Sequence, residues 1–133
     1  MSCLYDPIRG KTVAGTPEES LRQALLRQML DVLAFPKGLI AVEKKIGARR
    51  RVDIVAFAPK DGELKPLLLI ECKASAADEE VAFRQVAGYR TFLLAPFWCL
   101  AHPTGIRTFW SEGNTLRSVP FLPPYPQLLK RFV

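Results

Sequence analysis

The sequence predicts an α/β domain in which helices flank a mixed central β-sheet. The first observation is the order of the expected elements, a helix, three strands, a second helix and two more strands, which gives an α-β-β-β-α-β core. The second is the near-continuous aliphatic run at residues 67–70, which is typical of a central strand buried on both faces. The third is the helix between the third and fourth strands, because it leaves room for a parallel crossover.

The first helix is expected to begin after Thr16 and to end before Pro36. Thr16 is a good N-cap, and Pro17 suits the first helical position. Glu19, three residues after the cap, completes a capping box. Leucines recur at helical spacing from Leu21 onward and form an apolar stripe that should pack on the sheet.

Three strands should follow this helix. Two of them, at about residues 39–46 and 51–58, are joined by a short turn at Gly47. Asp61 and Gly62 are a turn signal before the third strand, at about residues 66–73. Because these connections are short, we expect the three strands to be antiparallel neighbours.

A second helix is expected at about residues 77–94, with Ser75 as its cap. Two short strands, at about residues 97–102 and 106–111, then surround a turn. The proline-rich tail, residues 114–133, should be mostly irregular apart from one short final helix.

The composition is that of one globular domain. The chain has 133 residues, of which 49% are hydrophobic and 24% are charged, and this length is enough to bury one core without cross-links. We expect a single domain over residues 1–133, with its core at about residues 16–111.

Cysteine usage indicates a reducing compartment. Cys3, Cys72 and Cys99 are scattered, no CxxC pair occurs, and His102 is the one histidine. This pattern argues against a disulfide framework and a structural zinc site, and it favours a cytoplasmic protein. The N-terminus lacks the apolar segment of a signal peptide, and no apolar run is long enough to span a bilayer, so no membrane partner is expected.

The chain is basic, with a formal net charge of +6, which suits a partner rich in phosphate. Five of the basic residues lie close together, around the first predicted strand turn. They are Lys44, Lys45, Arg49, Arg50 and Arg51. This run is either a solvated hairpin tip or, beside a catalytic site, a clamp for a phosphate backbone. Glu43 shares a strand face with Lys45, and we interpret it as a solvated residue.

Charged residues interrupt the end of the most hydrophobic predicted strand. Glu71 and Lys73 share one face of it, and Asp53 is an acid within the apolar preceding strand. If the two strands pair, Asp53 and Glu71 come close together, and burying both is costly unless a cation lies between them. Oxygen ligands of this kind suit Mg²⁺ or Mn²⁺, and a lysine beside the metal could position a water for hydrolysis of a phosphodiester. The alternative is an ordinary Glu–Lys ion pair, because E-x-K alone is a weak motif.

Together these residues resemble the PD-(D/E)XK nuclease superfamily, and most of all the nuclease domain at the N-terminus of type I restriction enzyme motor subunits. The superfamily pattern is matched by Asp53 in "VDIV" and by Glu71 and Lys73 in "IECKA". The restriction-subunit branch adds Q-x-x-x-Y on the next helix, matched by Gln85 and Tyr89. The opening at residues 6–23 is also similar. The resemblance implies a restriction-endonuclease-like fold.

The resemblance also implies a role for each matching residue. Asp53 and Glu71 would hold Mg²⁺ or Mn²⁺, with the backbone carbonyl of Cys72 as a third ligand, and Lys73 would position the attacking water. Gln85, as a site residue, and Tyr89, as a DNA-binding residue, would contact the DNA backbone or brace Lys73. The alternative is a half-buried tyrosine that packs over the sheet with a glutamine beside it.

A glutamate of the first helix would also join the site. Either Glu18 or Glu19 could do so, and we favour Glu18 slightly because the capping box already accounts for Glu19.

The resulting hypothesis is a metal-dependent DNA endonuclease. Its partners would be DNA and either a motor or specificity subunit or a second copy of the chain. No GxxxxGK[ST] motif occurs, so no ATP-driven motor is expected within this chain. The alternative function is a catalytically inactive nucleic-acid-binding or assembly module that keeps the nuclease fold. A nucleotide- or CoA-using enzyme is disfavoured, because no phosphate-binding glycine loop is present.

Overall fold

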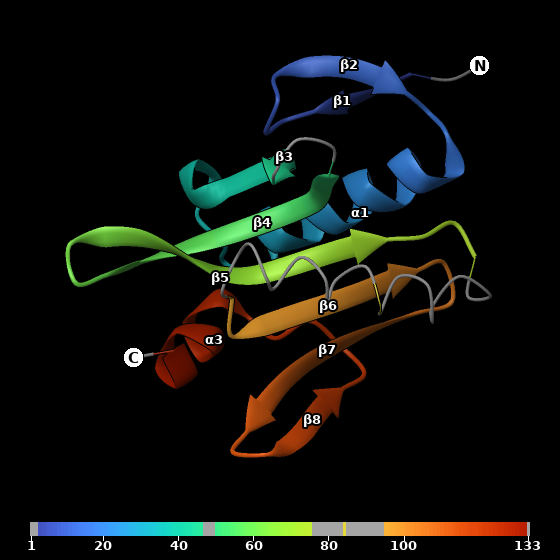
Figure 1. The fold of residues 1–133 in the computed structure, drawn as a ribbon. Coiled ribbons are helices and arrows are strands. Elements are labelled where there is room, and N and C mark those ends of the chain that lie inside the picture. The colour runs from blue at the N-terminus through green and yellow to red at the C-terminus, as the bar shows by residue number, and fades with distance from the viewer. Residues whose placement is uncertain (1–2, 47–49, 76–83, 85–94, 133) are drawn as a thin grey trace.

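A computed structural model describes residues 3–46, 50–75, 84 and 95–132. Its main feature is a six-stranded sheet with the order β3-β4-β5-β6-β7-β8 (Figure 1). The strands are β3 (Ile40–Ile46), β4 (Arg50–Lys60), β5 (Glu63–Cys72), β6 (Phe97–His102), β7 (Gly105–Glu112) and β8 (Thr115–Val119). β5 and β6 are parallel and the other neighbours are antiparallel. The predicted mixed α/β architecture with a central β5 is therefore confirmed.

Helix α1 (Pro17–Asp31) begins where its local signals place it. The hydroxyl of Thr16 accepts a hydrogen bond from the Glu19 amide at 3.2 Å, and Pro17 occupies the first turn. A short 3-10 turn, η1 (Lys37–Leu39), then leads into β3. The Asp61 and Gly62 turn between β4 and β5 is also confirmed, with φ values of 54° and 79°.

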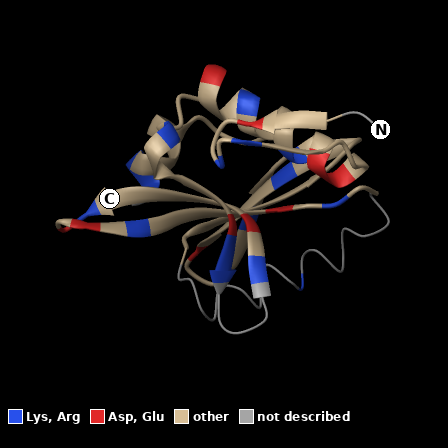
Figure 2. Ribbon diagram, turned by 90° about the horizontal axis from the view of Figure 1, so that it is seen from above, with Lys and Arg blue, Asp and Glu red and all other residues tan. Residues whose placement is uncertain are grey.

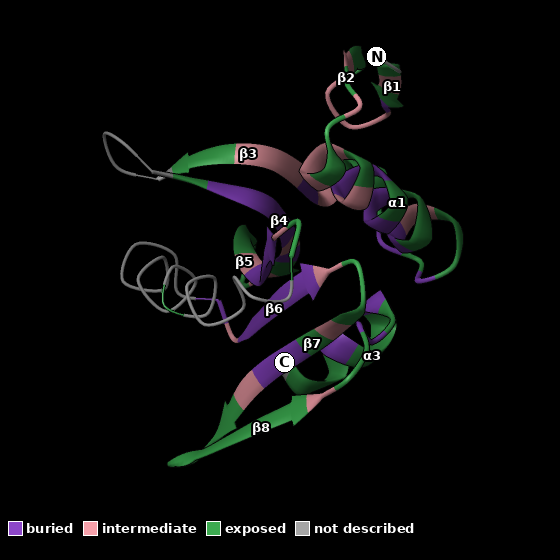
Figure 3. Ribbon diagram, turned by 90° about the vertical axis from the view of Figure 1, so that its right-hand side faces the viewer, coloured by how far each residue is buried: buried purple, intermediate pink, exposed green. Residues whose placement is uncertain are grey.

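α1 and α3 (Tyr125–Phe132) pack on the same face of the sheet (Figure 3). Leu26 and Met29 of α1 and Leu128 of α3 are buried against Ile54 and Ile70 of the central strands. The opposite face of these strands is also apolar and buried. The second helix predicted from the sequence falls outside the described residues except for residue 84. No helix in the described ranges is long and apolar enough to cross a membrane.

The C-terminal residues contain more regular structure than the sequence suggested. β8 adds an edge strand after a turn at Gly113, whose φ is +58°. The expected short final helix is present as α3. The Tyr125 hydroxyl donates to the Phe57 carbonyl at 3.1 Å, and the Arg131 guanidinium lies 5.0 Å from the centre of the Trp110 ring. These contacts attach α3 to the sheet.

A two-stranded hairpin, β1 (Cys3–Asp6) and β2 (Lys11–Ala14), precedes α1 and was not predicted. Its turn is organised by the buried carboxylate of Asp6, which accepts the amides of Ile8 and Arg9, each at 2.8 Å. The same carboxylate accepts a hydrogen bond from the Gln23 side chain at 2.9 Å. The hairpin is therefore anchored to α1, above the edge of the sheet that β3 forms (Figure 1).

Candidate active site

Asp53 and Glu71 lie opposite each other at the end of the central strand pair. Ile54 of β4 pairs with Ile70 of β5. One step further along the same antiparallel register, Asp53 faces Glu71. Both are buried, at 8% and 4% exposure. The sequence-based expectation that these two acids come together therefore agrees with the geometry.

Two protein groups bind the Asp53 carboxylate. Its Oδ2 accepts the backbone amide of Cys72 at 2.6 Å, which connects the acid directly to β5. Its Oδ1 accepts Nη2 of Arg22, from α1, at 3.1 Å. The side chain of Cys72 points into the apolar core on the α1 face, as expected, and only its backbone belongs to this site.

Glu71 is the less satisfied of the two acids. Burial and the negative charge of Asp53 raise the pKa of Glu71 to about 8, although Lys73 opposes the shift. Nζ of Lys73 lies 3.4 Å from Glu71 Oε1. Glu71 Oε2 is buried without a hydrogen-bond partner among the described residues. Two adjacent carboxyls with one poorly satisfied oxygen are an environment that a cation would stabilise.

Lys73 is the first residue after β5 and remains fixed to the sheet. Its backbone amide donates to the Ala101 carbonyl of β6 at 2.8 Å. Its side chain is 19% exposed, whereas that of Glu71 is 6% exposed. The ammonium group of Lys73 therefore lies between the buried acids and the solvent, on the side from which a substrate would approach.

Glu19 extends the site toward the N-terminal hairpin. Its carboxylate lies 2.6 Å from Nη2 of Arg9 and 3.1 Å from Nη1 of Arg22. The Glu19 carboxylate therefore forms ion pairs with two arginines, and one of them, Arg22, also binds Asp53. Glu19 pairs with the arginine bound to Asp53. The sequence-based preference was slightly for Glu18, and which of the two glutamates acts in the site stays a prediction.

Glu43 belongs to the same cluster, which corrects its interpretation as a solvated strand residue. Its neighbours on β3 pair with the neighbours of Asp53 on β4, so the register places Glu43 opposite Asp53. Three arginines lie near its carboxylate, at 3.5 to 3.6 Å. They are Arg9, Arg22 and Arg51. Its φ of 52° is unusual for a side-chain-bearing residue and locally interrupts the β3 ladder.

A surface hollow of about 430 Å³ lies beside this cluster. It is lined by Thr16, Pro17, Glu18, Glu19, Arg22, Glu43 and Ala74. Ala74 directly follows Lys73, and Arg22 contacts Asp53, so the hollow opens next to the two buried acids. Glu18 thus lines the approach to the site together with Glu19.

The basic residues singled out in the sequence flank the free end of the β3–β4 hairpin. In Figure 2, basic segments border the turn between these strands, and acidic segments lie deeper in the same strands. Lys44, Lys45 and Arg51 are exposed. Arg50 is placed in β4 by its backbone, and nothing is described of its side chain.

Three predicted site residues cannot be placed. Arg49, Gln85 and Tyr89 lie outside the described residues. The Q-x-x-x-Y motif of the second predicted helix therefore stays a sequence-based prediction.

The donor set fits a divalent cation that keeps part of its water shell. Within the described ranges, no three His, Cys, Asp or Glu side chains are grouped as a metal site. Two carboxylates and a backbone carbonyl could nevertheless be enough ligands for Mg²⁺. Proteins often bind this ion through only one or two carboxylates, because it retains several of its waters. The poorly satisfied Glu71 oxygen is the observation that favours a cation here.

A family model described as the type I restriction enzyme R protein N terminus (HSDR_N) matches residues 17–114. The chain belongs to this family. No curated protein and no solved structure matches the chain. The restriction enzyme R protein N-terminal match includes α1 and β3 to β7, and with them Glu19, Asp53, Glu71 and Lys73. The resemblance noted in the sequence is thereby confirmed at the level of the family, which is consistent with a nuclease-like domain.

In this restriction-enzyme domain, sequence reasoning missed Arg22, the arginine that binds Asp53. It immediately follows Leu21 and lies one turn before Leu25 and Leu26, so it falls beside the buried stripe of α1. A charged residue at such a position needs a buried partner. That signal was present in the sequence, although it did not reveal that the partner is Asp53.

Proposed function

We propose that this chain is a metal-dependent DNA endonuclease domain that hydrolyses phosphodiester bonds. The observation that supports this most is the placement of two buried acids opposite each other, Asp53 and Glu71, with Lys73 3.4 Å from Glu71 at the mouth of the site. Membership of the restriction enzyme R protein N-terminal family gives independent support. We further propose that the sheet and α1 form a restriction-endonuclease-like core.

Asp53, Glu71 and the Cys72 carbonyl would hold Mg²⁺ or Mn²⁺. The cation would supply Lewis-acid stabilisation of the charge that develops on the scissile phosphate. Lys73 would orient the attacking water by hydrogen bonding and would stabilise the negative charge of the transition state.

DNA would approach along the basic side of the β3–β4 hairpin. Lys44, Lys45 and Arg51 are exposed there and would contact phosphates without reading bases. Arg49 and Arg50 continue the same basic run in the sequence, and Tyr89 and Gln85 would add contacts from the second predicted helix. Cleavage of both strands would need a second copy, or a motor or specificity subunit, in a cytoplasmic assembly.

A plasmid-nicking assay tests this function. Supercoiled DNA is incubated with the full chain and Mg²⁺ or Mn²⁺, and the Lys73→Ala variant is run in parallel with an EDTA control. The matched control is Lys65→Ala, because Lys65 also lies on β5 and pairs with a glutamate two residues away, Glu63, at 3.0 Å. We expect nicking by the wild type and by Lys65→Ala, and none by Lys73→Ala or in EDTA. Equal nicking by Lys73→Ala and Lys65→Ala would contradict the assignment.

One observation favours a second function, a catalytically inactive DNA-binding or assembly module. Both oxygens of Asp53 already have protein donors, Arg22 and the Cys72 amide, so this acid is satisfied without a cation. A module of this kind would bind DNA with the same affinity in wild type and in Lys73→Ala. It would also leave plasmid, single-stranded and branched DNA intact under all metal conditions.

A further inference from the structure

Arg22 connects α1 to the proposed cation site. Its Nη2 donates to Asp53 Oδ1 at 3.1 Å, and only 6% of its side chain is exposed. We propose that Arg22 is a built-in counter-ion for Asp53 that a divalent cation displaces, so that this arginine lowers the affinity of the site for the cation. The inference rests on the proposed function, because it takes Asp53 as a cation ligand.

The guanidinium group of Arg22 presents a positive charge to Asp53, at 3.1 Å from its Oδ1. A divalent cation bound to the same carboxylate would repel this guanidinium at short range, in a buried environment where screening by salt is weak. The two positive groups therefore compete for Asp53.

The surroundings of Arg22 also provide a place to which it can withdraw. Its Nη1 lies 3.1 Å from Glu19 Oε2 and 3.5 Å from Glu43 Oε1. Only Nη2 is committed to Asp53. If that hydrogen bond to Asp53 broke, Arg22 would still pair with two carboxylates, so displacement does not require a buried, unpaired charge. The 430 Å³ hollow that Arg22 lines lies on this side of the cluster.

Asp53 itself would remain in position while Arg22 moves. Its Oδ2 accepts the Cys72 amide at 2.6 Å, a hydrogen bond that a cation at Oδ1 would not disturb. The Asp53 carboxylate is thus held in place by β5 through Oδ2. Its Oδ1 can bind either Arg22 or a cation. A structural ion pair with no such role would instead leave the cation affinity unchanged when Arg22 is replaced.

Calorimetric titration of Mn²⁺ into the full chain separates these two roles. The variant is Arg22→Gln, which removes the charge and keeps a polar side chain. The matched control is Arg9→Gln, because Arg9 also pairs with Glu19 and Glu43 but has no contact with Asp53 in the structure. Both variants remove one positive charge from the same cluster.

We expect Arg22→Gln to bind Mn²⁺ about tenfold more tightly than the wild type, and Arg9→Gln to change the affinity less than threefold. Unchanged or weaker binding by Arg22→Gln would overturn the inference. An equal increase in Mn²⁺ affinity in the two variants would also overturn it. The increase would then come from the lower net positive charge of the cluster rather than from competition at Asp53.

An Asp53→Asn variant distinguishes failure of this inference from failure of the proposed function. If the wild type binds Mn²⁺ in an Asp53-dependent way and Arg22→Gln binds no better, the cation site stands and the role of Arg22 is wrong. If neither the wild type nor Arg22→Gln binds Mn²⁺, both proposals fail.

A measurement on the wild-type protein covers the case in which Arg22→Gln does not fold. The Nε–H resonance of Arg22, assigned with a conservative Arg22→Lys variant, is followed by NMR during titration with Mg²⁺. We expect a saturable shift of this resonance, with the Arg9 resonance changing much less. A resonance that stays in place while amides near Asp53 shift would show that the cation binds without displacing Arg22.

Discussion

Asp53 and Glu71 face each other across β4 and β5, and the pKa of Glu71 is raised to about 8 by burial and by the charge of Asp53. The folded, metal-free protein therefore holds a carboxyl group that resists ionisation at neutral pH. In the unfolded chain the same group ionises with its ordinary pKa near 4.5. This difference makes the acid pair costly for stability, and the cost depends on pH.

Replacing Glu71 with Gln should stabilise the metal-free protein at high pH. Between about pH 4.5 and 8 the folded state takes up a proton that the unfolded state does not, so wild-type stability falls as pH rises through this window. The variant does not undergo this decrease. We expect a gain in unfolding free energy on the order of 2 kcal/mol at pH 8 and much less at pH 5, measured by urea denaturation in EDTA. A variant that is less stable than wild type at pH 8 would contradict this prediction.

Addition of Mn²⁺ should reverse the order of the two proteins at pH 8. Binding of a cation to the folded state alone raises stability in proportion to the logarithm of its concentration above the dissociation constant. We expect the melting temperature of the wild type to rise with Mn²⁺ and that of Glu71→Gln to change little. Parallel increases in the two proteins would place the cation elsewhere.

Asp6→Asn should destabilise the protein at neutral pH but not in acid. Burial alone would raise the pKa of Asp6, but hydrogen bonds from the Arg9 backbone, the Arg9 side chain and Gln23 hold it below its usual 3.8. The ionised form therefore stabilises the fold above about pH 3.8, and this contribution is lost as pH falls through the lowered value. We expect a loss of roughly 1–3 kcal/mol at pH 7, shrinking below pH 4, with the exposed Asp31→Asn as control. A loss that does not depend on pH would indicate a different cause.

Glu19→Gln should loosen the N-terminal hairpin. Its carboxylate is one of the connections between Arg9, in the hairpin turn, and Arg22 on α1. Without the carboxylate, donors of the two arginines lose their acceptor, and we expect roughly 1–3 kcal/mol of destabilisation. Hydrogen exchange of the β1 and β2 amides should become faster, whereas the exposed control Glu63→Gln should leave it unchanged. Unaltered exchange in Glu19→Gln would show that the hairpin is held by Asp6 alone.

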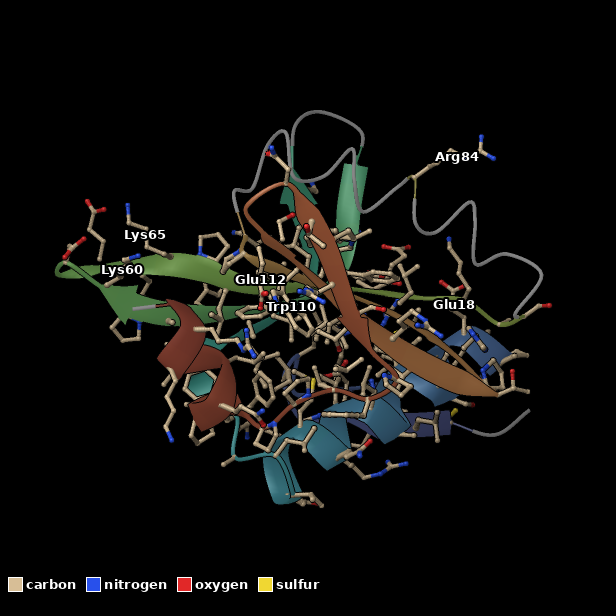
Figure 4. The ribbon with its side chains drawn as sticks, turned by 90° about the horizontal axis from the view of Figure 1, so that it is seen from below. Glu18, Lys60, Lys65, Arg84, Trp110 and Glu112 are labelled. Atoms are coloured by element: carbon tan, nitrogen blue, oxygen red, sulfur yellow. The ribbon has the colours of Figure 1, made fainter. Side chains whose placement is uncertain are left out.

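The basic end of the β3–β4 hairpin should contribute to DNA affinity by binding phosphates. A Lys44→Gln, Lys45→Gln double variant should bind DNA more weakly and lower the slope of log affinity against log salt by about 0.9 for each phosphate that is no longer neutralised. The control is Lys60→Gln with Lys65→Gln, because these lysines lie at the tip of the β4–β5 hairpin, away from Glu18 (Figure 4). Fluorescence anisotropy at several salt concentrations measures both the DNA affinity and its dependence on salt. Equal effects of the two double variants would indicate attraction by net charge alone.

The sequence predicted those parts of the fold that depend on local signals. Thr16 and Pro17 define the start of α1, and the aliphatic residues before Glu71 define a central strand. Each is determined by residues within a few positions, which is why the signals could be interpreted without a structure.

The strands that were missed, β1, β2 and β8, are short and largely exposed, with little periodicity. β1 and β2 surround an Asp-initiated turn that ends at Gly10, with φ of +65°. β7 and β8 are joined at Gly113 and Asn114, a glycine-containing pair that is a recognised hairpin signal. The turn chemistry was therefore visible at both places, and the weak strand patterns hid it.

The candidate site was predictable where it follows strand alternation and not where it depends on tertiary packing. Glu71 and Lys73 alternate along β5, and Asp53 is an acid among apolar residues, so their meeting could be inferred. The pairing of Arg22 with Asp53 joins residues 31 positions apart on a helix and a strand. No local pattern specifies such a pairing, because it depends on how α1 is rotated against the sheet.

The central claim, that a divalent cation binds between Asp53 and Glu71, is tested most directly by paramagnetic broadening with Mn²⁺. Amide resonances of the full chain are recorded while Mn²⁺ is added in amounts well below one equivalent. We predict that the amides of Asp53, Cys72 and Lys73 broaden first, while those of Glu63 and Lys65 at the other end of β5 persist. Broadening that begins elsewhere, or none at millimolar Mn²⁺, would contradict the claim.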